Sequence, residues 1–353
     1  MTAGATRRAA ARDAFLAAAG WGGADRAPLA GDASPRRYER LRDGPRRAVL
    51  MDALPETGED VRPFAALTGW LRDHGFAAPE IYAADPARGF LLLEDLGDGL
   101  FARLCATEQT REPDLYAAAV DLLLDLHALA PPARAEGAGC IHRVAPYDAA
   151  ALLREARLAV EWWAPAAGAA LSPDAEAEFD GLVRETCAQA ARNRSALVLR
   201  DYHAENLIWD AAAAPRARVR LLDYQDALAG APAYDLISLL EDARRDVAPA
   251  LRLAMTARYA DAAAARDPRF DREGFAADCA ALAAQRNLKI VGIFARLALR
   301  DGKPGYIPLI PRVWDHLMRD VAHPDLAALA AFTRRWIPAP TPKRLAAVAA
   351  KAA

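Results

Sequence analysis

The chain has 353 residues, of which 54% are hydrophobic and 26% charged, so it can bury one large core or two modest ones. Its 45 Lys and Arg residues nearly balance 47 Asp and Glu residues, and the net charge of -2 excludes the bulk field that favours nucleic acid or a membrane surface as a partner. The first twenty residues predict an amphipathic helix rather than a signal peptide, and no apolar run reaches membrane-spanning length. We therefore expect a cytoplasmic protein whose four scattered cysteines are reduced structural thiols.

The first 95 residues predict a small α+β unit. A turn at 31–34 precedes a strand that ends at Leu41, and a second strand covers 47–52. Apolar residues at helical spacing predict a helix over 61–74, and strands over 81–84 and 90–94 complete an antiparallel sheet. The acidic, glycine-containing segment 95–99 is typical of a connector, so we place a domain boundary after Asp95.

The rest of the chain, 96–353, is expected to be mainly helical. Periodic apolar residues predict a helix over 113–129, and Ser172-Pro173-Asp174 is a strong start signal for a helix that runs to about Arg192. Further helices are expected from about residues 232, 248, 273 and 311, and a short one after Pro324. The alanine- and lysine-rich tail after Pro338 is expected to fray.

Acids and an amide stand at a distinctive spacing between two short apolar runs. Asn206 follows Asp201 by five residues, and Asp223 follows Asn206 by seventeen. This is the spacing at which phosphoryl-transfer catalysts place a hydroxyl-activating Asp, a metal-binding Asn and a metal-binding Asp. Oxygen ligands of this type suit Mg²⁺, which neutralises the charge on the phosphoryl group. The alternative is a loop whose polar side chains only make local capping bonds.

The chain resembles the aminoglycoside-phosphotransferase branch of the protein-kinase-like fold over nearly its whole length. The strongest local match is the run 201–206, Asp-Tyr-His-Ala-Glu-Asn, with Leu-Asp-Tyr-Gln-Asp at 222–226 downstream. Within the branch, the chain is most similar to bacterial anomeric kinases of N-acetylmuramate and N-acetylglucosamine, which serve peptidoglycan recycling. This narrower resemblance rests on the segments 31–38, 223–236 and 285–294.

The resemblance implies a two-lobed fold with a nucleotide-binding lobe over 1–95 and a helical lobe over 96–353. It implies ATP and Mg²⁺ as cofactors, Asp201 as the catalytic base and Asp235 as a structural acid that braces the catalytic loop. The implied metal ligands are Asn206 and Asp223. The implied nucleotide-binding residues are Asp32, Ala33, Ser34, Glu94, Asp95 and Leu96. The implied substrate-binding residues are His203, Gln225, Arg286 and Lys289.

Taken by itself, the turn at 31–34 is as compatible with an ordinary hairpin as with a phosphate-binding loop, whose Ser hydroxyl and main-chain amides would hold the phosphate. His203 is as compatible with packing of the loop as with orientation of a substrate.

Two positions depart from the family pattern. The His that many relatives carry two residues before the catalytic Asp is Leu199 here. The strand that should carry a nucleotide-binding Lys contains none over 49–52. Either Arg36, Arg37 or Arg47 covers the donor phosphates, with Glu59 or Asp60 as a possible partner, or Mg²⁺ and main-chain amides suffice. A nucleotide-binding protein with little catalysis is the third alternative.

Four basic residues lie on one face of the predicted helix that begins near Glu273: Arg286, Lys289, Arg296 and Arg300. Such a stripe would hold an anionic sugar such as N-acetylmuramate and would disfavour polycationic aminoglycosides. The alternative is a solvated helix face.

We therefore expect a small-molecule kinase that phosphorylates the anomeric hydroxyl of an N-acetylated amino sugar and needs no nucleic-acid or membrane partner. A monomer is favoured over an oligomer. The alternatives are a kinase of an aminoglycoside, choline or another sugar, and a catalytically weak nucleotide-binding regulator. A protein kinase is disfavoured, because only eight residues separate Asp223 from Pro232 and this is too short for a peptide-binding segment.

Overall fold

The computed structural model describes residues 3–29 and 35–352, and these residues form two compact units. Unit 1 comprises residues 1–118, 132–144 and 204–227. Unit 2 comprises residues 119–131, 145–203 and 228–353. The boundary predicted after Asp95 stays a prediction about which part of the chain binds a nucleotide.

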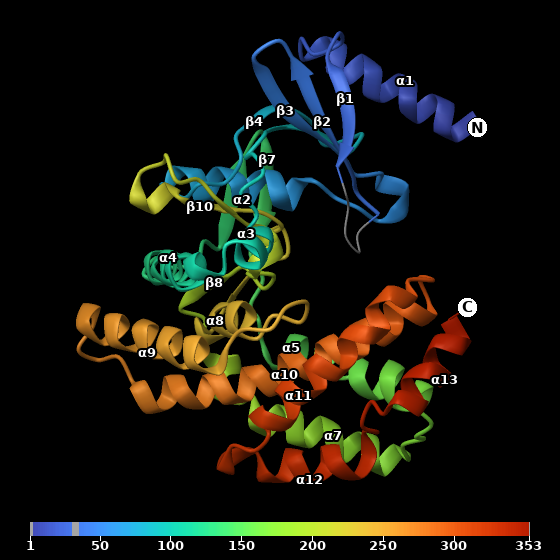
Figure 1. Ribbon diagram of the computed structural model, residues 1–353, viewed down its shortest axis with the longest axis vertical. Coiled ribbons are helices and arrows are strands. Elements are labelled where there is room, and N and C mark those ends of the chain that lie inside the picture. The colour runs from blue at the N-terminus through green and yellow to red at the C-terminus, as the bar shows by residue number, and fades with distance from the viewer. Residues whose placement is uncertain (1–2, 30–34, 353) are drawn as a thin grey trace. The chain divides into compact units, whose positions relative to one another are not determined.

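Unit 1 is built on a five-stranded antiparallel sheet with the strand order β1-β2-β3-β5-β4 (Figure 1). The strands are β1 (Asp25–Leu29), β2 (Arg37–Asp43), β3 (Arg46–Asp52), β4 (Ile81–Asp85) and β5 (Phe90–Glu94). The predicted strands at 47–52, 81–84 and 90–94 therefore lie within one residue of the observed ones. β3 and β5 occupy interior positions of the sheet, and most of their residues are buried.

The first helix, α1 (Ala3–Ala18), packs against one face of this sheet. Phe15 and Leu16 join Leu50, Phe90 and Leu92 in one buried cluster, and Phe15 stacks on Phe90 with ring centroids 5.5 Å apart. Burial of these side chains contributes on the order of 1.5–3 kcal/mol each to folding. The sequence prediction of a helix at the amino terminus is confirmed.

Unit 1 also contains α2 (Arg62–Asp73) and a hairpin of β6 (Arg134–Gly137) and β7 (Cys140–Arg143), which packs on it. A Cβ at Gly69 would lie 2.2 Å from the carbonyl oxygen of Glu136, and one at Gly137 would lie 2.3 Å from that of Ala65. Only glycine permits this close approach at both positions. The remaining elements of the unit are α3 (Phe101–Thr107), the first part of α4 (Glu112–His127), β9 (Leu207–Trp209) and β10 (Val219–Leu221).

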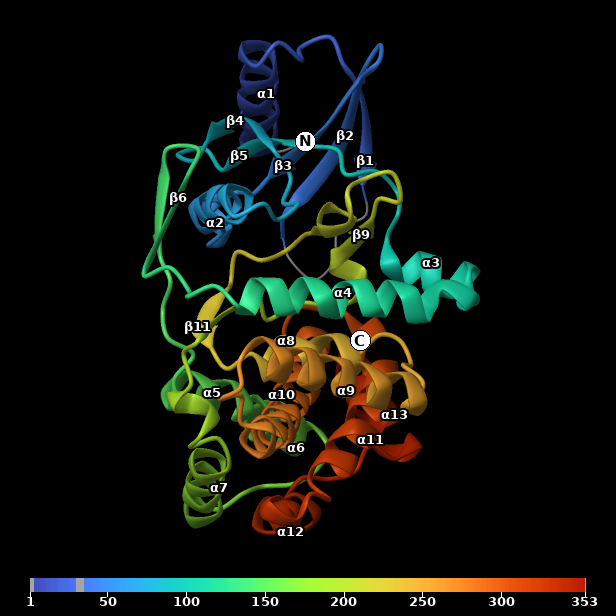
Figure 2. The same cartoon turned by 90° about the vertical axis from the view of Figure 1, so that its left-hand side faces the viewer.

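Unit 2 is mainly helical, and α10 (Arg272–Leu299) is its central element (Figure 2). Most of the 28 residues of α10 are buried on more than one side, because α5, α8, α11 and α13 all contact it. The other helices and strands of the unit are α5 (Ala149–Ala156), α6 (Ala164–Ala166), α7 (Pro173–Thr186), β8 (Ala196–Val198), β11 (Leu228–Gly230), α8 (Ala233–Leu240), α9 (Pro249–Arg266), α11 (Ile310–Asp320), α12 (Ala327–Trp336) and α13 (Pro342–Ala352). The Ser172 hydroxyl accepts a hydrogen bond from the Ala175 amide, as its capping role predicts.

A π-helix over Ala159–Trp163 packs directly against α10. At Gly292 a Cβ would lie 2.1 Å from the carbonyl carbon of Leu158 and 2.6 Å from the nitrogen of Ala159. The glycine of the segment 285–294 thus has a packing role, because it lets the main chain of the π-helix lie directly on α10.

The prediction that the tail frays is wrong. The segment after Pro338 forms α13, whose Val348 is fully buried and whose Lys351 donates a hydrogen bond to the carbonyl of Ala166. Trp163 also donates a hydrogen bond to the carbonyl of Pro338, at 2.8 Å. Composition suggested a frayed end, but burial of one apolar face against unit 2 stabilises the helix.

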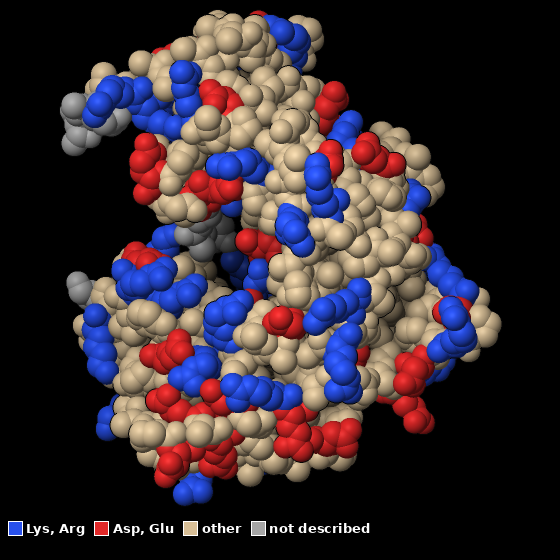
Figure 3. All heavy atoms as spheres, turned by 180° about the vertical axis from the view of Figure 1, so that it is seen from behind, with Lys and Arg blue, Asp and Glu red and all other residues tan. Residues whose placement is uncertain are grey.

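Within the described residues, no helix is long and apolar enough to cross a membrane. Figure 3 shows both basic and acidic side chains over one face of the molecule, in keeping with the near-zero net charge.

Candidate functional site

The main chain just before Asp201 is held by a buried carboxylate. Strand β8 pairs with β11 and ends at Val198, and the next two amides, of Leu199 and Arg200, donate to the two oxygens of Asp235 at 2.7 and 2.8 Å. Asp235 is fully buried, and His127 lies 3.5 Å from it. Arg200 has a φ of 72°, a left-handed conformation that is uncommon for a residue with a side chain. Asp235 thus fixes a strained turn that presents Asp201.

A buried ionic network lies beside this turn in unit 2. The carboxylate of Glu155 binds the guanidinium of Arg200 and the hydroxyl of Tyr147, and the ammonium of Lys289 lies 3.4 Å from it. Lys289 also donates to the Tyr234 hydroxyl at 3.2 Å. One carboxylate, largely shielded from solvent, therefore contacts two cations and balances one of their two charges.

This network controls the charge on Asp201, which is half-buried. Burial by itself raises the pKa of Asp201, but the positive charges of Lys289, Arg200 and Arg286 oppose it, and the pKa is lowered overall. The carboxylate is therefore ionised at neutral pH, as a group that accepts a proton must be.

The two basic residues predicted to bind substrate lie in the interior of unit 2. Lys289 is 8% exposed, and Arg286 is 4% exposed and donates to the Ser238 hydroxyl and the Glu241 carbonyl. Only Arg300 of the predicted stripe is exposed, and it pairs with Asp301. The alternative of a solvated face is therefore wrong for Arg286 and Lys289, while their contact with a substrate stays a prediction.

His203 is buried, and burial together with the charge of Arg244 lowers its pKa against the opposing charge of Asp242. The ring is therefore neutral at physiological pH. The neighbouring Tyr202 is also buried and donates to the carbonyl of Ala119 at 2.8 Å.

The predicted metal ligands both lie in unit 1, where strand pairing brings their segments together. β9 pairs with β10 in antiparallel register, and the Leu222 amide donates to the Asn206 carbonyl at 3.0 Å. Asn206 stands just before β9 and Asp223 two residues after β10. The pairing therefore places the two residues at the same end of the ribbon.

The segment around Asp223 is anchored on α2. Tyr224 is fully buried, stacks on Phe64 with centroids 4.8 Å apart and shares a 2.6 Å hydrogen bond with Thr68. Gln225 is also buried, and its amide donates to one oxygen of Asp223 at 3.0 Å. Asp223 itself has a φ of 57°, and its side chain is 44% exposed. Its neighbours thus hold Asp223 in a left-handed conformation and orient a carboxylate that stays partly exposed.

A guanidinium faces Asp223. Arg36, just before β2, binds Glu59 through its Nε at 2.5 Å, and its Nη1 lies 3.8 Å from Asp223 Oδ1. Of the three arginines considered from the sequence, Arg37 and Arg47 are exposed on the sheet and only Arg36 has an ion pair with Asp223 among the described residues.

The remaining predicted nucleotide-binding residues fall into two groups. Asp32, Ala33 and Ser34 lie outside the described residues. Glu94 ends β5 and binds Arg220 at 2.9 Å, and Asp95 binds Arg40 at 2.9 Å. Leu96 follows and is half-buried. The acids of this predicted hinge are therefore occupied by ion pairs, and the hinge role stays a prediction.

The chemistry of Asn206 and Asp223 fits a hard cation. Within the residues that the structure describes, no group of three or more His, Cys, Asp or Glu side chains could hold a metal. Mg²⁺ in phosphoryl-transfer enzymes is usually bound by one or two protein oxygens and completed by water and substrate phosphates, so an amide and a carboxylate suffice.

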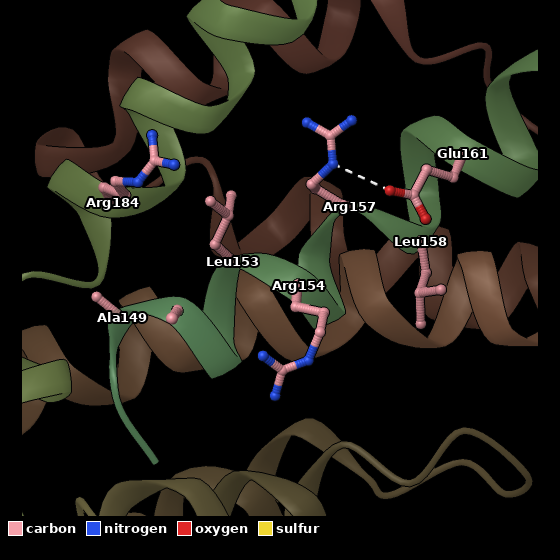
Figure 4. Close-up of a pocket in the computed structure, with 8 residues that line it drawn as sticks. Ala149, Leu153, Arg154, Arg157, Leu158, Glu161 and Arg184 are labelled. Carbon is pink, nitrogen blue, oxygen red and sulfur yellow. Dashed lines mark hydrogen bonds and ion pairs between the residues drawn. The ribbon is translucent and has the colours of Figure 1, made fainter. Parts of the chain in front are cut away.

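A pocket of about 520 Å³ lies elsewhere, within unit 2 (Figure 4). None of the predicted site residues lines it. Arg157, one of the residues that line the pocket, forms ion pairs with Glu161, Glu176 and Asp180. The charge of this arginine is therefore already compensated. The lining residues are Ala149, Ala150, Leu153, Arg154, Arg157, Leu158, Glu161 and Arg184.

Sequence reasoning missed Glu155. It stands in an ordinary amphipathic helix, α5, and no local pattern distinguishes it from a surface acid. Its importance comes from Arg200 and Lys289, which are 45 and 134 residues away along the chain.

Comparison with known proteins identifies relatives of this chain. The chain is 41% identical to the N-acetylmuramate/N-acetylglucosamine kinase of Caulobacter vibrioides, over 95% of this chain and 98% of that protein. It is 35% identical to the kinase of the same name from Pseudomonas aeruginosa, over 89% and 90% of the two chains.

Solved structures share the fold at lower identity. A choline/ethanolamine kinase family protein from Mesorhizobium loti has a TM-score of 0.58 at 16% identity, over 98% of this chain and 99% of that one. An aminoglycoside phosphotransferase in complex with GDP and kanamycin has a TM-score of 0.55 at 13% identity, over 85% and 94%. The chain therefore has the α+β fold of protein-kinase-like phosphotransferases. Residues 25–273 match the model of the phosphotransferase enzyme family, and the chain belongs to that family.

Proposed function

We propose that this chain is an ATP- and Mg²⁺-dependent kinase that phosphorylates the anomeric hydroxyl of N-acetylmuramate and N-acetylglucosamine. The observation that carries the proposal is the 41% identity, over 95% of the chain, to a curated kinase of that name. The proposed base, Asp201, and the proposed metal ligands, Asn206 and Asp223, lie in the described part of the chain.

Asp201 is proposed as the catalytic base. The buried cations around it keep its carboxylate ionised, and Asp235 fixes the turn from which it projects. The base accepts the proton of the anomeric hydroxyl as its oxygen attacks the γ-phosphorus, and the bond to the ADP oxygen breaks. Positioned base catalysis supplies about 10²–10⁴-fold in rate.

Asn206 and Asp223 are proposed to hold Mg²⁺ through their side-chain oxygens, with Gln225 orienting Asp223. When bound, the ion supplies neutralisation of the charge on the donor phosphates. Glu94, Asp95 and Leu96 are proposed to meet the adenine, and His203, Gln225, Arg286 and Lys289 to contribute to the substrate side. For Arg286 and Lys289, burial and the charge they exert on Asp201 favour an indirect contribution through the base.

The test is ADP release by the purified protein with Mg·ATP and a panel of acceptors: N-acetylmuramate, N-acetylglucosamine, glucose, choline and kanamycin. Asp201→Asn serves as the blank, because it keeps the shape and removes the base. We expect turnover of both acetylated amino sugars, lowered about 10²–10⁴-fold in the blank, with ATP binding retained. Equal loss of binding and turnover would contradict the role of Asp201.

The position of phosphorylation is tested with the 1-O-methyl glycoside of N-acetylglucosamine. Its anomeric oxygen carries no proton to remove, so it should not turn over, and the product from the free sugar should have lost its reducing end. Turnover of the glycoside would contradict anomeric phosphorylation. Activity on kanamycin or choline alone would contradict the proposed substrate and leave the phosphotransferase chemistry standing.

A further inference from the structure

We propose that Arg36 binds the phosphates of the nucleotide donor and that Glu59 orients it for this role. The inference rests on the proposed function. It concerns the contact to the donor phosphates, for which the sequence offered three arginines or Mg²⁺ with main-chain amides. It is carried by the juxtaposition of Arg36, Glu59 and Asp223 in unit 1, where three distant parts of the chain meet.

A cation at this place has to be an arginine. The lysines of the sequence are Lys289, Lys303, Lys343 and Lys351, and none belongs to unit 1. Arg36 differs from Arg37 and Arg47, which are exposed on the sheet, because its side chain is only 10% exposed and lies beside Glu59 and Asp223. Burial of a guanidinium is costly unless it has partners, so its place beside Asp223 is a specific feature of the fold.

The way in which Arg36 is held suits phosphate binding. Glu59 binds the Nε edge at 2.5 Å, which fixes the plane of the guanidinium. The terminal Nη1 faces Asp223 Oδ1 across 3.8 Å, which is within ion-pair distance and longer than a hydrogen bond between these two atoms. A phosphate bound to a cation at Asp223 would therefore lie close to the guanidinium of Arg36. A guanidinium is planar and can bind two phosphate oxygens at once.

The contacts of Arg36 also fit a purely structural role, in which it links β2 to the segment before α2. The two roles differ in what they do to ligands. A phosphate-binding arginine strengthens the binding of ATP and ADP but not of adenosine, whereas a structural arginine affects all three equally.

The experiment is calorimetric titration of the whole protein with ATP, ADP and adenosine in the presence of Mg²⁺ and without any sugar. The variants are Arg36→Ala and Arg36→Lys. Arg37→Ala is the matched control, because Arg37 is the adjacent residue and is exposed on β2. We expect Arg36→Ala to weaken ATP binding about 10- to 100-fold, the loss typical of a charged hydrogen bond, and adenosine binding by less than about twofold. Arg36→Lys should recover part of the ATP affinity, and Arg37→Ala should match the wild type.

An equal loss of adenosine and ATP affinity, or unchanged ATP affinity in both Arg36 variants, would overturn the inference. If Arg36→Ala does not fold, Glu59→Gln keeps the guanidinium and loses its orientation, and it should weaken ATP more than adenosine. Wild-type protein that binds ATP through Arg36 but phosphorylates no amino sugar would overturn the proposed substrate alone. Wild-type protein that binds no nucleotide would overturn both proposals.

Discussion

The buried carboxylate of Asp235 accepts a hydrogen bond from the main-chain amide of Arg200 at 2.8 Å. This bond stabilises Arg200 in a left-handed conformation, with a φ of 72°. A left-handed conformation costs a residue with a side chain on the order of 1–3 kcal/mol, so it persists only where its surroundings fix it. The residue that follows is Asp201. The strain in the turn and the position of the proposed base therefore depend on one acid 34 residues further along the chain.

We expect Asp235→Asn to lower both stability and turnover. The amide has one acceptor oxygen where the carboxylate has two, and its NH₂ group would face a main-chain N–H that needs an acceptor. The expected loss is about 2–4 kcal/mol in the free energy of unfolding, measured by urea titration, with a fall in kcat larger than any change in the KM for ATP.

Asp278→Asn is the matched control for this variant. Asp278 is a buried acid of α10 in the same unit, and burial raises its pKa. Its replacement should leave kcat near the wild-type value. A normal kcat in Asp235→Asn would show that the turn does not position the base.

Local signals in the sequence predicted most elements of the fold. Helix α2, strands β3 and β5 and the Ser172 cap stand where periodicity and capping chemistry place them, because each depends on residues close together in the chain. The helical tail and the interior position of Lys289 could not be predicted in this way. A stripe of charges on a helix looks the same whether it faces solvent or a buried acid such as Glu155, and only the packing of α10 decides between them.

The candidate site divides in the same manner. The spacing of Asp201, Asn206 and Asp223 predicted the base and the metal ligands, because all three residues belong to one continuous segment whose length the chemistry constrains. Glu155, which holds Lys289 from a distant segment, left no pattern at its own position. Arg36 was one of three candidate arginines, and only its contact with the distant Asp223 distinguishes it from the other two.

The ion pair of Glu155 and Lys289 should show strong energetic coupling. Lys289→Met leaves Glu155 buried with less compensating charge, and we expect a loss of about 3–5 kcal/mol in the free energy of unfolding. Adding Glu155→Gln should recover part of that loss, since it removes the uncompensated charge. A complete double-mutant cycle by urea unfolding measures the coupling, and additive effects would show that the two groups do not interact.

Gly292→Ala should be one of the most destabilising small substitutions in unit 2. Its Cβ would meet main-chain atoms of Leu158 and Ala159 at 2.1–2.6 Å, and main chain cannot move aside as a flexible side chain can. We expect a fall in Tm of roughly 10 °C or failure to fold. Gly181→Ala is the control: it lies within α7 with no atom within 4 Å of a Cβ, and it should gain up to about 1 kcal/mol from helix propensity. Similar outcomes for the two variants would show that Gly292 is not a packing constraint.

The stability of the fold should fall as the pH is lowered through the titration of His316. Burial lowers the pKa of this residue to about 4, and although Glu241 opposes the shift, the charges of Arg319, Arg286 and Arg312 add to it. Because an unfolded histidine has a pKa of about 6.5, the unfolded state binds the proton first as the pH falls. The contribution of a neutral His316 is therefore complete above about pH 6.5 and is lost progressively down to about pH 4.

The matching experiment compares the free energy of unfolding at pH 7 and pH 4.5 in the wild type, in His316→Asn and in His323→Asn. His323 has a side chain that is 38% exposed, so its replacement should leave the pH response unchanged. His316→Asn should lose about 1–3 kcal/mol less than the wild type on acidification, since it has no proton to take up. Parallel pH responses in all three proteins would show that the titration of His316 does not contribute to the acid sensitivity of this unit.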